Sequence, residues 1–265
     1  MEIIGYIASI FIGIALGLIG GGGSILTVPV LVYLFAVDAV AAAAYSLFIV
    51  GLTSAVGSVS YFKNGLVNVK TAIIFGVPSI IAVFLTRAYI VPAIPKEVFS
   101  IGSFMVTKSI LMMLLFAVLM IATSYSMIKK DKKKTTENEG EQKFNYPVIL
   151  FEGAVVGILT GLVGAGGGFL IIPALVILSK LPMKEAVGTS LVIIAAKSLI
   201  GFFGEGAETL INWNLLFTVS AFAIVGIFIG IMLSKKVDGA KLKPAFGWFV
   251  LVMGIYIIIK ETILK

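Results

Sequence analysis

Cysteine and histidine are both missing from this sequence of 265 residues, and charged residues make up only 12% of it. Without these side chains the protein cannot form disulfides, use a thiol nucleophile or build the sites that most often hold zinc or haem. It also lacks the side chain that titrates most readily near neutral pH. We therefore expect no metal site and no cofactor.

Polar residues are scarce along the whole chain. Hydrophobic residues account for 60% of it, and the mean hydropathy is +1.15. The apolar runs are continuous rather than alternating, which is typical of membrane-spanning helices. The net charge of +7 does not indicate a nucleic-acid partner, because the basic residues lie mainly in short loops, where membrane topology explains them. We therefore expect a multi-pass protein of the cell membrane, whose apolar helices contact the lipid bilayer.

A glycine-rich break occurs twice. Residues 17–29 read GLIGGGGSILTVP and residues 161–173 read GLVGAGGGFLIIP, so the two copies lie 144 positions apart without a gap. The same offset relates Asn68 to Asn212. A register held over this distance indicates a structural duplication.

The expected fold class is all-α: a polytopic helical membrane protein of two inverted five-segment repeats, each with a Gly-broken helix hairpin. We expect the first membrane repeat at 1–128, a polar cytoplasmic linker at 129–146 and the second membrane repeat at 147–265. The predicted segments of the first repeat are 3–19, 24–37, 39–62, 69–90 and 99–128. Those of the second are 147–163, 169–180, 184–204, 213–234 and 244–260. The segment 3–19 is read as a retained helix, since no basic residues precede it.

The distribution of lysine and arginine orients the chain, since basic loops favour the cytoplasm. With the linker inside and five crossings in each half, most lysines fall in inner loops, and both termini lie outside. The basic residues predicted outside are Arg87, Lys96, Lys260 and Lys265. Because five is odd, the second half is inverted relative to the first, a recurring architecture of secondary transporters.

The breaks are the first candidate binding feature. Glycines let the backbone take φ > 0, and an unwound backbone survives in a membrane only inside protein or beside a polar cavity. Paired breaks in corresponding positions indicate a transporter's binding site, and a helix starting there offers free N–H groups to an anion. Close helix packing or a simple hinge is the alternative. The predicted substrate-binding residues here are Gly22, Gly23, Ser24, Gly166, Gly167 and Gly168.

Lys197 is the strongest single candidate for a substrate-binding residue, because it lies well inside the predicted helix 184–204. A lysine at mid-membrane costs about 2.5–3.5 kcal/mol on insertion scales, and no acidic residue lies in the middle of any predicted span. This suits an anionic ligand, although backbone carbonyls at a broken helix are an alternative partner. Lys108 is a weaker candidate, since it could extend towards the outer face.

Hydroxyl groups complete the predicted site. They could donate to an anion, or each could bond back to its own helix. These candidates are Ser46, Thr53, Ser54, Thr189, Ser190 and Ser198.

The paired motif at 17–29 and 161–173, the small-residue helices that follow, and the duplicated plan resemble the sulfite exporter TauE/SafE family over essentially the whole chain. The first copy departs slightly, with Ser24 where the second has Gly168. The resemblance implies transport of sulfur-containing anions, such as sulfite or organosulfonates, across the cell membrane.

Three functions remain open from the sequence. The first is an anion transporter with a central site and alternating access, and the second is a passive anion channel. The third, a membrane-embedded enzyme, is disfavoured because the chain has neither histidine, cysteine nor a deep carboxylate pair for acid–base chemistry. The sequence indicates no particular oligomeric state.

Overall fold

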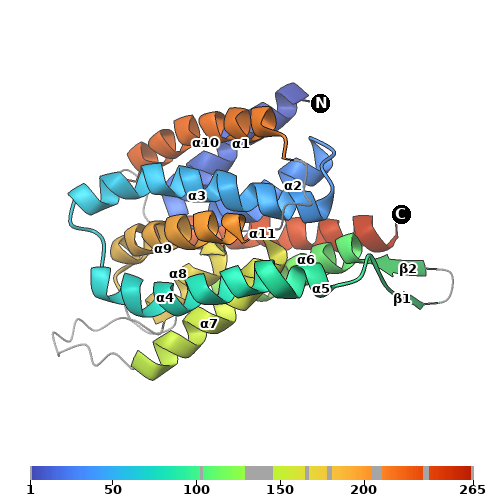
Figure 1. Ribbon diagram of the computed structural model, residues 1–265. Coiled ribbons are helices and arrows are strands. Elements are labelled where there is room, and N and C mark those ends of the chain that lie inside the picture. Colours follow the sequence, from blue (N-terminus) through green and yellow to red (C-terminus); the bar gives the residue numbers. More distant parts are fainter. Residues whose placement is uncertain are drawn as a thin grey trace.

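The computed structural model describes residues 2–101, 104–128, 146–164, 167–177, 181–204, 211–234 and 239–263. The first half contains α1 Glu2–Ile19, α2 Gly22–Tyr33, α3 Ala39–Lys63, α4 Val69–Leu85, the π-helical turn η1 Thr86–Ile90, α5 Val91–Ala93, β1 Glu97–Ile101, β2 Phe104–Thr107 and α6 Lys108–Ile128. The second half contains α7 Tyr146–Val163, α8 Gly168–Ile177, α9 Met183–Phe203, α10 Trp213–Ser234 and α11 Gly239–Thr262 (Figure 1).

Several of these helices are membrane-spanning by length and composition. Among the described residues, five helical segments qualify: Ala39–Lys63, Val69–Ala93, Lys108–Tyr125, Met183–Phe203 and Trp213–Ser234. The apolar helices beside the breaks, such as Gly23–Tyr33, are shorter. This architecture confirms the predicted all-α polytopic fold.

The predicted duplication recurs in the positions of the elements. Helices α1, α3 and α4 begin at residues 2, 39 and 69, and α7, α9 and α10 begin at residues 146, 183 and 213. Asn68 and Asn212, which precede α4 and α10, each accept a backbone N–H three residues on, at 3.0 and 3.1 Å. Such N-caps typically contribute about 1 kcal/mol to the stability of a helix. The two halves therefore start equivalent helices with the same kind of cap.

The two halves exchange equivalent contacts. Helix α1 packs on α10, and α7, its counterpart, packs on α4. A Cβ added to Gly13 would overlap the backbone of Ala223, and one added to Gly157 would overlap the backbone of Ser79. These four positions are two pairs 144 residues apart, so the glycines allow the same close approach on both sides.

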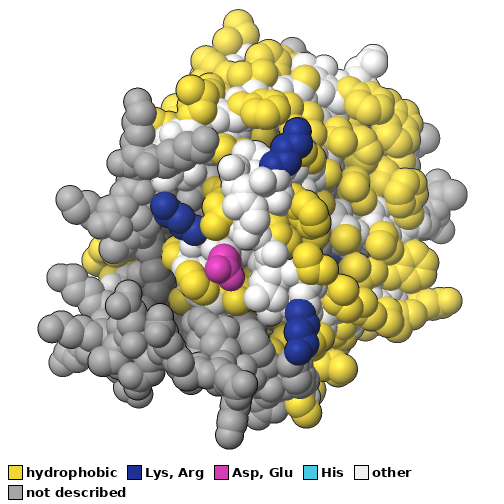
Figure 2. Space-filling model, turned by 90° about the vertical axis from the view of Figure 1, so that its left-hand side faces the viewer, with side chains coloured by type: hydrophobic (Ala, Val, Ile, Leu, Met, Phe, Trp, Pro, Cys, Tyr) yellow, Lys and Arg dark blue, Asp and Glu magenta, His cyan; other side chains and the backbone are white. Residues whose placement is uncertain are grey.

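Equivalent helices run in opposite directions in Figure 1: α1 and α3 run from right to left, and α7 and α9 from left to right. Both chain termini lie at the right-hand end. Figure 2 views the opposite end, where basic side chains lie among other polar groups and hydrophobic side chains cover the flanks. The exposed residues near this end include Lys63, Lys70 and Lys184.

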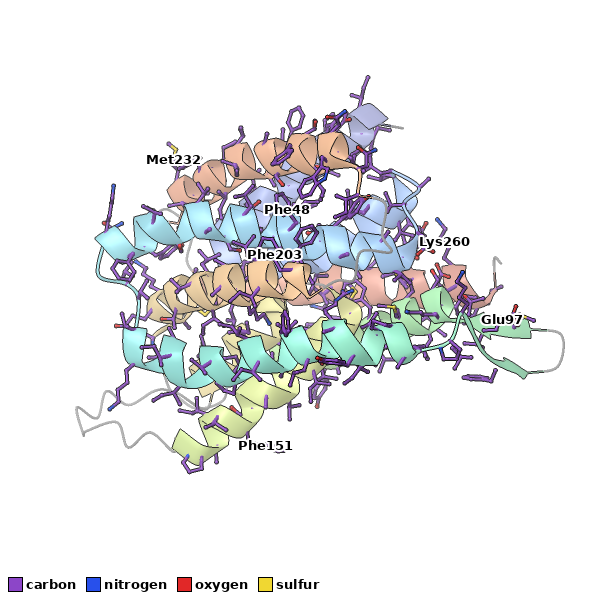
Figure 3. All side chains as sticks on the ribbon, viewed as in Figure 1. Phe48, Glu97, Phe151, Phe203, Met232 and Lys260 are labelled. Carbon is purple, nitrogen blue, oxygen red and sulfur yellow. The ribbon has the colours of Figure 1, made fainter. Side chains whose placement is uncertain are left out.

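The hydrophobic flanks suit a lipid environment. Figure 3 labels Met232 and Phe151 at opposite edges of the bundle, where their side chains are 69% and 68% exposed. Phe203, at the end of α9, is 76% exposed. In water, so much exposed apolar surface would favour aggregation. In a bilayer these side chains face acyl chains.

The structure corrects the predicted segment 99–128. Strands β1 Glu97–Ile101 and β2 Phe104–Thr107 pair antiparallel, with Ile101 opposite Phe104, and the helix begins only at Lys108. The signal was present, because two short apolar runs flank a Gly-Ser pair, a pattern typical of a tight hairpin. Elsewhere, the predicted segment 24–37 ends as a helix at Tyr33, and the segment 69–90 passes from α-helix to π-helix at Thr86. Most of the predicted linker, residues 129–145, lies outside the described residues.

Candidate functional site

Both breaks take the backbone conformation that their glycines predict. Gly20 has φ +78° and its counterpart Gly164 has φ +72°, and Gly167 adds a third positive value of +70°. L-residues with a Cβ rarely adopt this conformation. The prediction that the glycines let the chain leave the helix with positive φ is therefore confirmed at these positions.

The two breaks touch each other. A Cβ added to Gly21 would overlap the backbone of Gly168, and a Cβ added to Gly168 would overlap the backbone of Gly21. Each break also lies against the other half: Gly20 against Val187 of α9, and Gly164 against Ala43 of α3. Segments 144 residues apart in sequence thus meet at one place inside the protein.

Lys197 lies at this place. Its side chain is fully buried, and Nζ donates a hydrogen bond of 3.1 Å to Thr160 Oγ1 on α7. A Cβ added to Gly167 would lie only 2.5 Å from the same Nζ. The ammonium group therefore contacts the second break directly. The hydroxyl of Thr160 is neutral, so this hydrogen bond does not offset the positive charge of the ammonium group.

Arg87 is a functional candidate that sequence reasoning missed. The sequence interpretation placed it outside, at the end of a span, but its side chain is 1% exposed. A Cβ on Gly164 would overlap its Nη2 atom, so the guanidinium contacts the same break as Lys197. The π turn η1 extends the helical segment as far as Ala93, which keeps Arg87 within it. The available signal was a single arginine inside an apolar run.

The first break lacks this basic character. At the offset of 144 residues, Lys197 corresponds to Thr53 and Arg87 to Ile231. Thr53 donates its hydroxyl to Ile49 O of its own helix at 2.7 Å, which is the local bonding that the sequence left as the alternative. The two half-sites are therefore unequal, and positive charge is concentrated at the second.

The predicted hydroxyl residues have different surroundings. The Ser190 hydroxyl donates to Val187 O of its own helix at 2.8 Å and also lies 3.3 Å from Gly20 O of the first break, while Thr189 accepts the backbone N–H of Asn68 at 2.9 Å. Three hydroxyls are fully buried and have no hydrogen-bond partner among the described residues: Ser46, Ser54 and Ser198. An unsatisfied buried hydroxyl costs about 1–3 kcal/mol, which makes these groups available for a ligand.

The remaining predicted residues lie around the breaks or away from them. Ser24 donates its hydroxyl to Gly21 O at 2.7 Å, and Gly23 packs against the backbone of Ile12 in α1. Gly22 is the first residue of α2, and Gly166 lies outside the described residues. Lys108 is the first residue of α6, and its Nζ donates to Val91 O. That contact joins α6 to α5.

Comparisons with known proteins place the chain among membrane transporters. The family profile described as "Sulfite exporter TauE/SafE" matches residues 6–257. A "Probable membrane transporter protein" of Xylella fastidiosa (strain Temecula1) is 30% identical over 254 residues, which cover 93% of this chain and 91% of the relative. "Probable membrane transporter protein YunE" of Bacillus subtilis is 29% identical over 235 residues, 83% of this chain and 84% of the relative. No solved structure matches the chain.

The family match spans both breaks and nearly all of the described helices. Together with the five long apolar helices found among the described residues, it identifies a multi-pass membrane protein of transporter type. The chain belongs to the sulfite exporter TauE/SafE family.

Proposed function

We propose that the protein is a secondary transporter that moves small sulfur-containing anions, such as sulfite or organosulfonates, across the cell membrane. Transport would proceed by alternating access around a central site where the two breaks meet. The observation that carries the proposal is the fully buried ammonium of Lys197 against Gly167 of the second break.

Charge is the physical reason for an anionic substrate. An ion buried in a membrane protein is costly unless a partner offsets the loss of hydration. Lys197 donates a hydrogen bond to the neutral Thr160 hydroxyl, and Arg87 is a second buried basic residue at the same break. An anion that enters here would gain strong, poorly screened attraction. Sulfur-containing anions are proposed as the substrate because of the family's name.

The repeat supports alternating access. Equivalent helices that run in opposite directions, as in Figure 1, are what an inverted repeat requires. In such a protein, one half rocks against the other around a fixed central site. The direct contact of Gly21 with Gly168 is consistent with a closed passage between the halves, which favours a carrier over a permanently open channel.

A flux assay with purified protein in proteoliposomes tests the proposal. We expect uptake of labelled sulfite to saturate and to show counterflow when the vesicles are loaded with unlabelled sulfite. Lys197→Ala should abolish flux, while the matched control Lys184→Ala, at an exposed position of the same helix, should retain it. Current without exchange would identify a channel, and equal flux in the two variants would contradict the central role of Lys197.

A further inference from the structure

Ser46 of α3 and Ser190 of α9 occupy equivalent positions in the two halves, 144 residues apart. The surroundings of Ser190 are given by direct contacts. A Cβ added to Gly20 of the first break would lie 2.8 Å from Ser190 Oγ and 2.9 Å from Val187 Cα. One turn of α9, from Val187 to Ser190, therefore lies against the break of the other half.

The same arrangement recurs at the second break. Gly164 lies against Ala43 of α3, and Ala43 is the counterpart of Val187. Ser46 follows Ala43 by three residues, and residues three apart are neighbours on one face of a helix. Ser46 therefore lies towards the second break as Ser190 lies towards the first.

The two hydroxyls differ in their hydrogen bonds. Ser190 donates to Val187 O at 2.8 Å and also lies 3.3 Å from Gly20 O. Ser46 is fully buried, and its Oγ has no hydrogen-bond partner among the described residues, which include the equivalent acceptors in Ala43 and Gly164. A buried hydroxyl without a partner destabilises the fold. The second break therefore keeps a donor unused where the first break has one that is bonded.

Ser46 and Lys197 lie beside the same turn of backbone. Lys197 Nζ donates to Thr160 Oγ1 at 3.1 Å, and Thr160 O accepts the backbone N–H of Gly164 at 2.8 Å. The ammonium group thus contacts the start of this turn, and the α3 turn that ends at Ser46 contacts its end. One helical turn rises only about 5.4 Å, so a single small anion is long enough to reach both groups.

We infer that Ser46 is a second substrate-contacting residue, whose hydroxyl donates to an oxygen of the anion that Lys197 attracts. This inference rests on the proposed function, because it adds a contact to the same site. Sulfite and sulfonates carry several acceptor oxygens on one sulfur atom. One oxygen can therefore face the ammonium group while another accepts a hydrogen bond from Ser46. Ser190 is not available in this way, because its hydroxyl already donates to its own helix.

This role gives Ser46 opposite effects on stability and on binding. Replacing an unsatisfied buried hydroxyl with a methyl group removes the cost of its burial, so Ser46→Ala should be more stable than the wild-type protein without ligand. The same change removes a donor to the anion, so the affinity should fall. A serine that only supports the fold would lower the stability when replaced and leave the affinity unchanged.

Calorimetric titration with sulfite, together with melting temperatures measured without ligand, tests the inference. Ser46→Ala should weaken sulfite binding by roughly 10- to 100-fold, as expected for one hydrogen bond to a charged group, and raise the melting temperature by roughly 2–4 °C. Ser190→Ala should lower the melting temperature and weaken binding less, because its hydroxyl is already bonded. The control Ser9→Ala, at a buried serine of α1 that donates to Gly5 O at 2.8 Å, should leave the affinity unchanged.

The outcomes separate the inference from the function on which it rests. Wild-type affinity in Ser46→Ala, whatever its melting temperature, would overturn the role of Ser46 and leave the transporter intact. Equal losses of affinity in Ser46→Ala and Ser190→Ala would also overturn it. If the alanine variant fails to fold, Ser46→Cys decides, because it keeps a similar side chain with a much weaker donor and should also bind sulfite more weakly. A wild-type protein that binds no sulfite and shows no flux would overturn the proposed function itself.

Discussion

Gly21 and Gly168 lie in backbone contact at the point where the two breaks cross, so neither position has room for a Cβ atom. One glycine precedes α2 in the first half, and the other opens α8 in the second. Their contact couples the two halves at the proposed site. A movement of one half against the other at this point would change this contact.

The variant Gly168→Ala should therefore lose transport and lower the melting temperature, because its methyl group would overlap Gly21 and displace one break. The matched control is Gly76→Ala in α4, where the added Cβ would meet Ile193 at an ordinary 3.7 Å. There the higher helix propensity of alanine should stabilise the protein by up to about 1 kcal/mol. Thermal unfolding and flux measured on both variants check this. Wild-type flux in Gly168→Ala would show that the crossing is not required.

A second pair of glycines separates backbone strain from loss of the site. Gly65 and Gly167 have similar φ values of +67° and +70°, but a Cβ on Gly65 meets nothing within 4 Å. Gly65→Ala should cost about 1–2 kcal/mol of stability through backbone strain alone and leave anion binding unchanged. In Gly167→Ala the added methyl group would also press on Thr160 and Lys197, so sulfite affinity should fall as well. Titration of both variants with sulfite measures whether Gly167→Ala alone loses affinity. Equal affinities would remove Gly167 from the site.

Topology gives a third prediction, and the absence of native cysteine makes it simple to measure. Asn64 lies in the turn between α3 and α4, and Glu97 begins the hairpin at the other end of the molecule (Figures 1 and 3). In intact cells, Glu97→Cys should react with a membrane-impermeant maleimide, whereas Asn64→Cys should react only after permeabilisation. The reverse pattern would overturn the predicted orientation with both termini outside.

Much of the fold could be predicted from the sequence because its signals are periodic and repeated. Continuous apolar runs predicted the helices, and the offset of 144 residues predicted equivalent elements. The offset also matched Asn68 to Asn212, and the structure shows that both are helix N-caps. The strands β1 and β2 were missed because their apolar residues, read with the following run, resemble one long span. The Gly-Ser pair between the two short apolar runs favours a hairpin, but the length of the whole apolar run favoured a helix.

The candidate site was only partly predictable, since it depends on contacts between the halves. Lys197 stood out because a charge deep in a span is costly. Arg87 did not, because whether an arginine near the end of a span is buried depends on its neighbours. Here the π turn and the approach of Gly164 from the second half bury it, and neither can be inferred from one segment alone. Likewise, Ser190 and Thr53 both bond to their own helices, and only the packing of the two halves brings Ser190 within reach of Gly20 O as well.

The affinity of Lys197 variants for sulfite tests the central claim most directly. If the ammonium binds the anion, Lys197→Ala should weaken binding by about 1.5–3 kcal/mol, the value of one charged hydrogen bond. Lys197→Arg should retain part of the affinity, and Lys197→Glu should be worse than alanine because it brings like charge to the ligand. Thermal stability measured on the same four proteins separates binding from folding. Unchanged affinity in a folded Lys197→Ala protein would contradict the account and leave the anion to other groups at the breaks.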